Sequence, residues 1–425
     1  MESSDGKIIY QIFVRNHTPE GTIKGVIKDL NRIKDLGVDI IYLMPIHEIG
    51  RVNRKGKYGS PYAIKDYITI SKDLGTFSDL SLLIRETHKR GMKIIMDMVF
   101  DHTSPDSVLT YNHIEYYYIE DGMPVNRIGD WDDVIDLDVE RKDVQDYLIG
   151  ILRTYYQLGV DGFRFDVASL LPLEFFARAR IALGEDVLFF AEDIDDGFKR
   201  YLRKIGRHYE EDEDLVPTFD LLYNYNYFPK INRFIKEKNP EPLRDAIRII
   251  NKESTVHPEI LRSNCLENHD NDRIASQLNI LELINMLTMF ISLRGCAFLY
   301  AGEEYGLKHK PELFEKDPIE WSLKSNTIYE YVKEIIELKK EFGPIETQYI
   351  EEIGNLCVFK LTIKNQEKER VFLVNLNEDP ILIEKILKES YDEVLNHVLK
   401  DKIDDGEVIL SEPLIFTFHS DEERS

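Results

Sequence analysis

Short apolar runs alternate with amphipathic stretches along most of the 425-residue chain. The runs are rich in Ile, Val, Leu and Phe, which favours strands, whereas the stretches between them repeat apolar residues every three or four positions, which favours helices. The predicted strands cover residues 8–14, 39–45, 93–99, 162–167, 187–192, 216–222, 261–266 and 297–300. The clearest predicted helices cover residues 25–36, 78–90, 173–182 and 281–293.

This alternation predicts an α/β fold made of parallel strand–helix–strand units. Eight such strands joined by right-handed crossovers can close into a (β/α)₈ TIM barrel. The alternative is an open, doubly wound sheet, but no glycine-rich phosphate loop follows the first predicted strand. We therefore expect a barrel.

Two segments break the pattern. Residues 102–137, rich in Tyr, Asp and Gly, separate the third strand from a helix that starts near Glu140, and they predict a short inserted domain B. After a predicted helix at 328–342, the alternation acquires the period of two that is typical of antiparallel strands. The period-two stretches are 349–363, 370–376 and 407–418, with one helical piece near 381–388. We expect a catalytic barrel over 1–344, interrupted by 102–137, and a C-terminal antiparallel β domain over 345–425.

The composition excludes some classes of function. Acidic residues outnumber basic ones by 78 to 54, which gives a formal net charge of −24, and no block of Lys or Arg offers a footprint for nucleic acid. The acidic run at 210–214 is expected to be a solvated loop. A neutral sugar is compatible with this charge, and the sequence leaves the oligomeric state open.

Three observations bear on location. No apolar run reaches the roughly 20 residues that a membrane span needs, and the sequence after Met1 lacks the basic and apolar regions of a signal peptide. The three cysteines are odd in number and far apart, so they do not form a disulfide framework. We expect a cytoplasmic protein with no membrane partner.

Polar residues cluster where four of the predicted strands end, and active sites of such barrels lie at the carboxyl ends of the strands. Asp97 and Asp101 lie on one face of the third strand. Arg164 and Asp166 are also two positions apart, so the Arg can keep the carboxylate ionised, as a nucleophile requires. A structural ion pair is the alternative for each.

Two further clusters complete the set. Glu192 follows Phe189 and Phe190, and a carboxyl group against an aromatic wall has a raised pKa that suits a general acid. The alternative is a helix cap. Residues 267–270, Glu-Asn-His-Asp, are poor strand formers and good ligand binders. A metal-dependent hydrolase is the alternative here, although no H-x-H or H-E-x-x-H pair is present. Tyr58, Tyr62 and Tyr67 are candidates to stack on a sugar, and the alternative for each is an ordinary core or surface tyrosine.

Together these residues resemble glycoside hydrolase family 13, the α-amylase family. The four regions occur in the family's order, as DMVFDH at 97–102, GFRFD at 162–166, FAE at 190–192 and ENHD at 267–270. Further similarities are YAIKDY at 62–67, LYAGEE at 299–304 and DPIEW at 317–321. The resemblance covers residues 8–344.

The resemblance implies a role for each matching residue in a retaining hydrolysis of α-glucosidic, mainly α-1,4, bonds in maltodextrins or starch-like glucans. Asp166 is implied as the nucleophile, Glu192 as the general acid/base, Asp270 as the stabiliser of the transition state, Arg164, His102, His269 and Tyr62 as substrate-binding residues, and Asp97 as a structural anchor under the site. The implied partner is an α-glucan oligosaccharide.

Three departures from the family pattern refine this. Asp101 replaces the usual Asn before His102, and Val167-Ala168 replaces a Lys-His pair whose His contributes to a calcium site. The early loop at 15–21 also lacks an Asp-rich calcium pattern, so we expect no obligatory metal. Gly59 replaces an Asp found three residues before the stacking tyrosine in the exo-acting branch, which favours an amylase acting on maltodextrins over an α-glucosidase. The short inserted segment at 102–137 is expected to leave an open cleft.

Other reactions use the same residues. An α-glucosidase, a transglycosidase or a phosphorylase of this family remains an alternative, since the acceptor side of the site is not encoded in these motifs. A non-catalytic carbohydrate-binding or interaction protein is the second alternative. Such relatives lose acids of the triad, whereas Asp166, Glu192 and Asp270 are all present.

Overall fold

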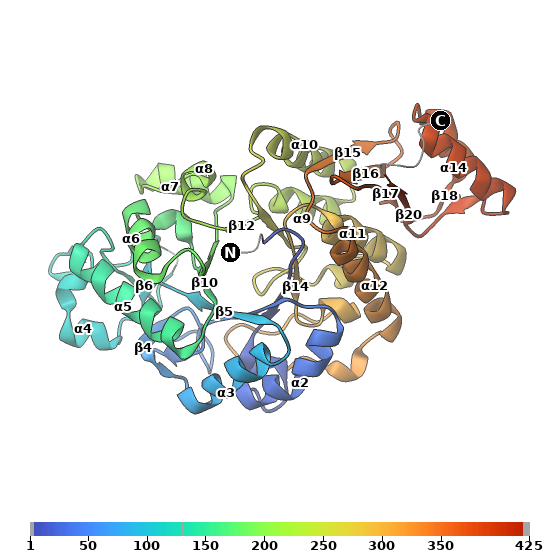
Figure 1. The fold of residues 1–425 in the computed structure, drawn as a ribbon. Coiled ribbons are helices and arrows are strands. Elements are labelled where there is room, and N and C mark those ends of the chain that lie inside the picture. The colour runs from blue at the N-terminus through green and yellow to red at the C-terminus, as the bar shows by residue number, and fades with distance from the viewer. Residues whose placement is uncertain (1–3, 130, 420–425) are drawn as a thin grey trace.

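The computed structural model describes residues 4–129 and 131–419, and its core is a closed barrel of eight parallel strands (Figure 1). The strands are β1 (Ile8–Ile12), β2 (Ile40–Leu43), β5 (Lys93–Met98), β10 (Gly162–Phe165), β11 (Leu188–Ala191), β12 (Leu221–Tyr223), β13 (Arg262–Asn264) and β14 (Cys296–Tyr300). Strand β1 pairs with both β2 and β14, which closes the sheet. The predicted barrel is confirmed.

Side chains of each strand alternate between two cores. Ile8, Tyr10 and Ile12 of β1 point outwards into the layer beneath the helices. Ile9 points inwards, where it packs with Tyr42, Phe190 and other large residues that fill the barrel. This period of two follows from the pleat of a strand. The short, continuous apolar runs seen in the sequence are therefore strands buried on both faces.

Helices surround the barrel. They include α2 (Ile23–Asp35), α3 (Phe77–His88), α5 (Lys142–Leu158), α6 (Leu173–Leu183), α7 (Asp196–Ile205), α9 (Phe228–Glu237), α10 (Pro240–Val256), α11 (Ile280–Ser292) and α12 (Asn326–Phe342). Local signals set their ends. Thr76 and Asp79 form a capping box at the start of α3, and α5 ends at Gly159, whose φ of 107° favours glycine.

Two local predictions were wrong. The strand expected at 216–222 is confined to β12, because Pro217 has no backbone N–H to donate to a ladder and the preceding residues form the short helix α8 (Asp212–Leu215). The loop expected at 15–21 begins within a helical turn, α1 (Val14–His17), whose side chains are buried.

The acidic run at 210–214 also differs from expectation. Asp212, in α8, is buried rather than solvated, and it pairs with Arg262 at 2.7 Å and with Lys199 at 3.1 Å. The run therefore contributes a carboxylate to an internal ion network.

The inserted segment leaves the barrel after β5 and consists of short elements. These are β6 (His102–Thr103), α4 (Val108–Asn112), β7 (Ile119–Glu120), β8 (Met123–Pro124) and β9 (Ile135–Asp136). Antiparallel pairing of β6 with β9 brings the two ends of the segment together above β5. This arrangement fits the expected inserted domain, whose exact limits stay a prediction.

The C-terminal part is an antiparallel sheet, as predicted. Its strand order is β15 (Thr347–Glu352), β16 (Val358–Lys364), β17 (Lys368–Asn375) and β20 (Leu414–His419). Beside it lie α13 (Ile383–Glu389), near the predicted helical piece, and α14 (Glu393–Asp404), which the sequence analysis missed. Helix α14 escapes a periodicity search because just two of its residues, Leu395 and Leu399, are buried.

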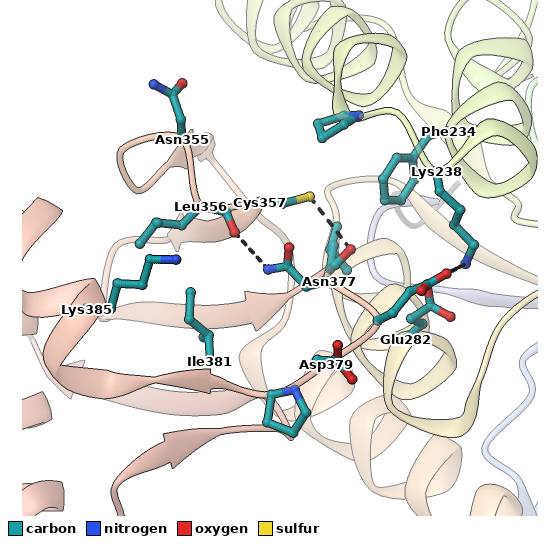
Figure 2. Close-up of a pocket in the computed structure, with 14 residues that line it drawn as sticks. Phe234, Lys238, Glu282, Asn355, Leu356, Cys357, Asn377, Asp379, Ile381 and Lys385 are labelled. Atoms are coloured by element: carbon teal, nitrogen blue, oxygen red, sulfur yellow. Dashed lines mark hydrogen bonds and ion pairs between the residues drawn. The ribbon is translucent and has the colours of Figure 1, made fainter.

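The sheet contacts the barrel helices α10 and α11, red against yellow in Figure 1. A cavity of about 500 Å³ remains between α9, α11 and the loops of the C-terminal part (Figure 2). Lys238 and Glu282 form an ion pair on one side of it, and Cys357 lies on the other.

All three cysteines are buried and free, as expected. Within the described ranges, no helix has both the length and the apolar character of a membrane span.

Candidate active site

The guanidinium of Arg164 lies at the centre of the polar residues that the barrel gathers at the carboxyl ends of its strands. It is fully buried, and its Nη1 donates to Asp97 Oδ1 at 2.7 Å and to Asp166 Oδ1 at 2.8 Å. Its Nη2 lies 2.7 Å from Glu192 Oε1. Strands β5, β10 and β11 thus bring three carboxylates onto one cation.

Asp97 forms the floor of this cluster. Its Oδ2 accepts hydrogen bonds from the hydroxyls of Tyr42 at 2.6 Å and Tyr62 at 3.0 Å, while Oδ1 faces Arg164. The carboxylate is fully buried and its partners belong to the protein. Asp97 therefore positions Arg164 and Tyr62 and does not itself face the space above the site.

The carboxyls of Asp166 and Glu192 are both shifted towards the protonated form. Burial raises the pKa of Glu192 to about 8, with Asp166 adding to the effect and Arg164 opposing it. Burial also raises the pKa of Asp166, to about 7, and Arg164 limits this increase. Glu192 therefore has the higher pKa of the two carboxyls, as is required when one group donates a proton and its neighbour attacks as an ionised nucleophile.

A strained residue connects the two. Val167 follows Asp166 and has a φ of 37°, which is unusual for a β-branched side chain. Its N–H donates to Glu192 Oε2 at 2.7 Å. Strain of this kind concentrates at functional sites, where the surrounding structure enforces it.

His269 and Asp270 follow β13 and complete the site from the opposite side of the barrel. His269 Nε2 lies 2.7 Å from the Tyr62 hydroxyl and 3.1 Å from Asp270 Oδ2, and the His269 and Tyr62 rings are stacked. Burial lowers the pKa of His269, which favours the neutral form of the ring. The Asp270 side chain is 50% exposed and is therefore free to contact a ligand.

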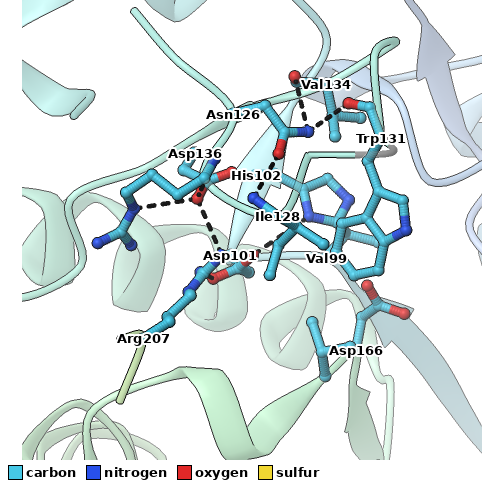
Figure 3. Close-up of polar contacts among 12 residues, drawn as sticks. Val99, Asp101, His102, Asn126, Ile128, Trp131, Val134, Asp136, Asp166 and Arg207 are labelled. Atoms are coloured by element: carbon cyan, nitrogen blue, oxygen red, sulfur yellow. Dashed lines mark hydrogen bonds and ion pairs between the residues drawn. The ribbon is translucent and has the colours of Figure 1, made fainter. Parts of the chain in front are cut away.

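His102 reaches the site from the start of the inserted segment. Its ring is buried and packs edge-on against Trp131, with the ring centroids 5.5 Å apart (Figure 3). Asp166 donates its backbone N–H to the carbonyl of Met98, at the end of the strand that leads to His102. The nucleophile candidate and His102 are consequently neighbours across β5 and β10.

The structure separates the three tyrosines. Tyr62 lies in the cluster, whereas Tyr67 is buried beneath it and donates to the Val99 carbonyl at 2.6 Å, so Tyr67 is the core tyrosine of the alternative interpretation. Tyr58 packs against the guanidinium of Arg15, 5.6 Å from the centre of its ring. Its stacking on a sugar stays a prediction.

Sequence analysis missed several residues that touch the cluster. Tyr42 supports Asp97, and Gln11 Nε2 lies 2.9 Å from His269 Nδ1. Gln11 left a usable signal, since it is an amide inside the otherwise apolar strand β1. Trp131 left none, because an isolated Trp in an irregular segment has no pattern.

The placement of the His, Cys, Asp and Glu side chains bears on whether the protein can bind a metal ion. Among residues 4–129 and 131–419, no group of three or more His, Cys, Asp or Glu has the arrangement of a metal site. The absence of an obligatory metal stays a prediction.

Comparisons with known proteins show which family the chain resembles. A family model of the alpha-amylase catalytic domain matches residues 2–123 and 129–343. An alpha-amylase structure from Lactobacillus plantarum is 30% identical, with 97% of this chain and 99% of that chain covered and a TM-score of 0.86. A maltogenic alpha-amylase structure from Thermotoga neapolitana is 27% identical, with 88% and 87% covered and a TM-score of 0.77. Neopullulanase 2 of Thermoactinomyces vulgaris is 24% identical over 81% of this chain, which spans 61% of that protein.

Proposed function

Because the chain belongs to the α-amylase family of glycoside hydrolases, we propose that it cleaves α-1,4 bonds of maltodextrins or starch-like glucans with retention of configuration. The family shows that the chain is an enzyme acting on glucans. The observation that carries the finer proposal is the pair Asp166 and Glu192, which share the guanidinium of Arg164 on adjacent strands. Two carboxyl groups so placed can act on one glycosidic bond.

In the first step, Asp166 attacks the anomeric carbon while Glu192 gives its proton to the departing glycosidic oxygen. The glycosidic bond breaks and a covalent glucosyl ester of Asp166 forms. In the second step, the Glu192 carboxylate takes a proton from water, whose oxygen attacks the same carbon and releases Asp166. Two displacements restore the α configuration, and Glu192 ends protonated.

The remaining residues hold the sugar. Asp270 has an exposed carboxylate that can accept hydrogen bonds from two hydroxyls of the sugar. This interaction strengthens in the transition state, because positive charge develops on the sugar ring. His102, His269 and Tyr62 would contact the same sugar, with Tyr62 held in place by Asp97. Arg164 orients Asp166 and favours its ionised form, which opposes the effect of burial.

The proposal also assigns a role to each part of the chain and a location to the protein. The barrel over residues 1–344 would carry the site. The insert at 102–137 would form one wall of the site, and residues 345–425 would form a supporting β domain. Three buried free thiols fit a reducing compartment, so the cytoplasm is the proposed location.

The activity should depend on pH with two limbs. Below the pKa of Asp166 the nucleophile gains a proton and kcat/KM falls, and above the pKa of Glu192, about 8, the acid loses its proton and kcat/KM falls again. In Glu192→Gln the alkaline limb should vanish on an aryl maltoside whose leaving group needs no proton. The check is a pH profile of both proteins, and an alkaline limb that persists in Glu192→Gln would contradict the assignment.

A time course on maltoheptaose with a chelator tests the specificity. We expect the wild type to produce mixed short maltodextrins with or without chelator, because the charged groups at this site are paired within the protein. Glu192→Gln should produce almost none. Glucose released one unit at a time would instead identify an α-glucosidase, and longer products would identify a transglycosidase. Loss of activity with chelator would disprove metal independence.

A further inference from the structure

A second buried guanidinium, that of Arg207, lies where the inserted segment meets the barrel (Figure 3). Its Nη2 contacts Asp101 Oδ1 at 2.5 Å and its Nη1 contacts Asp136 Oδ2 at 3.0 Å. The side chain of Arg207 is 7% exposed, and both carboxylates are buried. Arg127 adds a contact to Asp136 Oδ2 at 3.1 Å.

Arg207 joins three parts of the chain. Asp101 follows β5, Asp136 belongs to β9, and Arg207 follows the end of α7. His102 and Asp136 are direct partners in the β6–β9 ladder, and Leu137 donates its N–H to the Asp101 carbonyl. The guanidinium therefore holds both ends of the inserted segment against a helix of the barrel.

Beside this contact lie two aromatic residues, His102 and Trp131, on the side that faces the proposed nucleophile Asp166. The second oxygen of Asp101, Oδ2, faces His102 Nδ1 at 3.5 Å, and the His102 ring packs against Trp131. Asn126 donates to the Trp131 carbonyl and accepts from Ile128 N–H at 2.7 Å. Figure 3 shows His102, Trp131 and Asp166 together, with Arg207 on the far side of Asp101.

Charge explains why Arg207 is needed. Burial opposes ionisation of Asp101, but Arg207 and His102 outweigh it and hold the pKa of Asp101 below its ordinary value. Burial and the nearby Asp101 raise the pKa of Asp136. Without the Arg207 guanidinium, the two buried carboxylates would face each other with no cation shared between them, leaving Arg127 beside Asp136 and His102 beside Asp101, which is unfavourable.

We propose that Arg207 is a positioning residue for catalysis: by bridging Asp101 and Asp136, it fixes His102 and Trp131 at the wall of the sugar site. The inference rests on the proposed function for its catalytic part. Asp101 directly precedes His102, so freeing the Asp101 carboxylate frees the His102 ring to turn away from the substrate. A misplacement of about 1 Å at a reacting sugar can lower the rate by about 100-fold.

A double-mutant cycle tests whether Arg207 acts through His102. Arg207→Ala should lower kcat on maltoheptaose by about 100-fold in the wild-type background, but by less than about threefold when His102 is already Ala. Arg207→Lys should keep intermediate activity, because an ammonium can pair with one carboxylate but cannot bridge two in the planar geometry of a guanidinium. Guanidinium ion added at low concentration should partly restore Arg207→Ala. Arg203→Ala, which alters an exposed residue of α7, is the matched control and should be unchanged.

Amide hydrogen exchange provides a readout that needs no turnover. Arg207→Ala should raise exchange in residues 126–129 and 131–137, and Arg203→Ala should not. Equal losses of kcat in both His102 backgrounds, or unchanged exchange in these residues, would overturn the proposal. If the wild type hydrolyses no glucan, the proposed function fails, and the exchange measurement still decides whether Arg207 fixes the segment.

Discussion

Asp166→Asn is expected to lower kcat on maltoheptaose by a factor on the order of 10⁴ or more. An amide of nearly the same shape can still accept from Arg164 Nη1, as Asp166 Oδ1 does at 2.8 Å. It cannot form the covalent glucosyl ester, so the first displacement is lost while the geometry survives. Initial rates of reducing-end release, with the variant at high concentration, measure this loss.

The same substitution should not destabilise the fold. The pKa of Asp166 is raised by burial, so its ionised form is disfavoured in the folded state relative to the unfolded chain. Removing this carboxyl should leave the free energy of unfolding at pH 7 unchanged or higher, as often happens when a catalytic residue is replaced. Residual activity of more than a few per cent in Asp166→Asn would refute the assignment of the nucleophile. Asp272→Asn, on an exposed residue of the adjacent loop, is the control and should keep wild-type kcat.

Arg262→Ala is expected to have the largest effect on stability. The Arg262 guanidinium pairs with Asp193 at 2.8 Å, Asp212 at 2.7 Å and Glu253 at 2.5 Å, and its side chain is 5% exposed. Removing it leaves the buried Asp193 without its ion-pair partner and Asp212 with Lys199 alone, a change that costs about 3–5 kcal/mol. Burial and the neighbouring Asp212 raise the pKa of Asp193, and Arg262 opposes this rise.

Urea unfolding followed by circular dichroism measures this change as a lower midpoint. Arg248→Ala is the matched control: Arg248 pairs with Asp245 in α10, but its side chain is 68% exposed, and exposed pairs contribute between 0 and about 1 kcal/mol. Activity should fall as well, since Asp193 directly follows Glu192. If Arg262→Ala and Arg248→Ala unfold at the same urea concentration, the ion network contributes nothing to stability.

The sequence by itself determined the features that depend on short separations along the chain. Strand and helix periods repeat within a few residues, so the eight strands and the change to an antiparallel pattern after residue 344 were readable. Arg164 and Asp166 share a face because side chains in a strand repeat every two positions. The aromatic residues before Glu192 likewise predicted a carboxyl group whose pKa burial would raise. The motifs at the strand ends could be placed together because parallel strands of a barrel all end on one rim.

Contacts between distant segments were decided by the tertiary structure. Arg207 and Asp101 are 106 positions apart, and Arg262 and Asp193 are 69 positions apart, so no local pattern links either pair. Which carboxylate meets which guanidinium depends on how loops of different strands lie over the barrel rim. For the same reason, the acidic run was expected in solvent, although Asp212 is buried against Arg262. Local periodicity encodes the elements and their buried faces, whereas the pairing of buried charges is fixed when the closed barrel brings separate loops together.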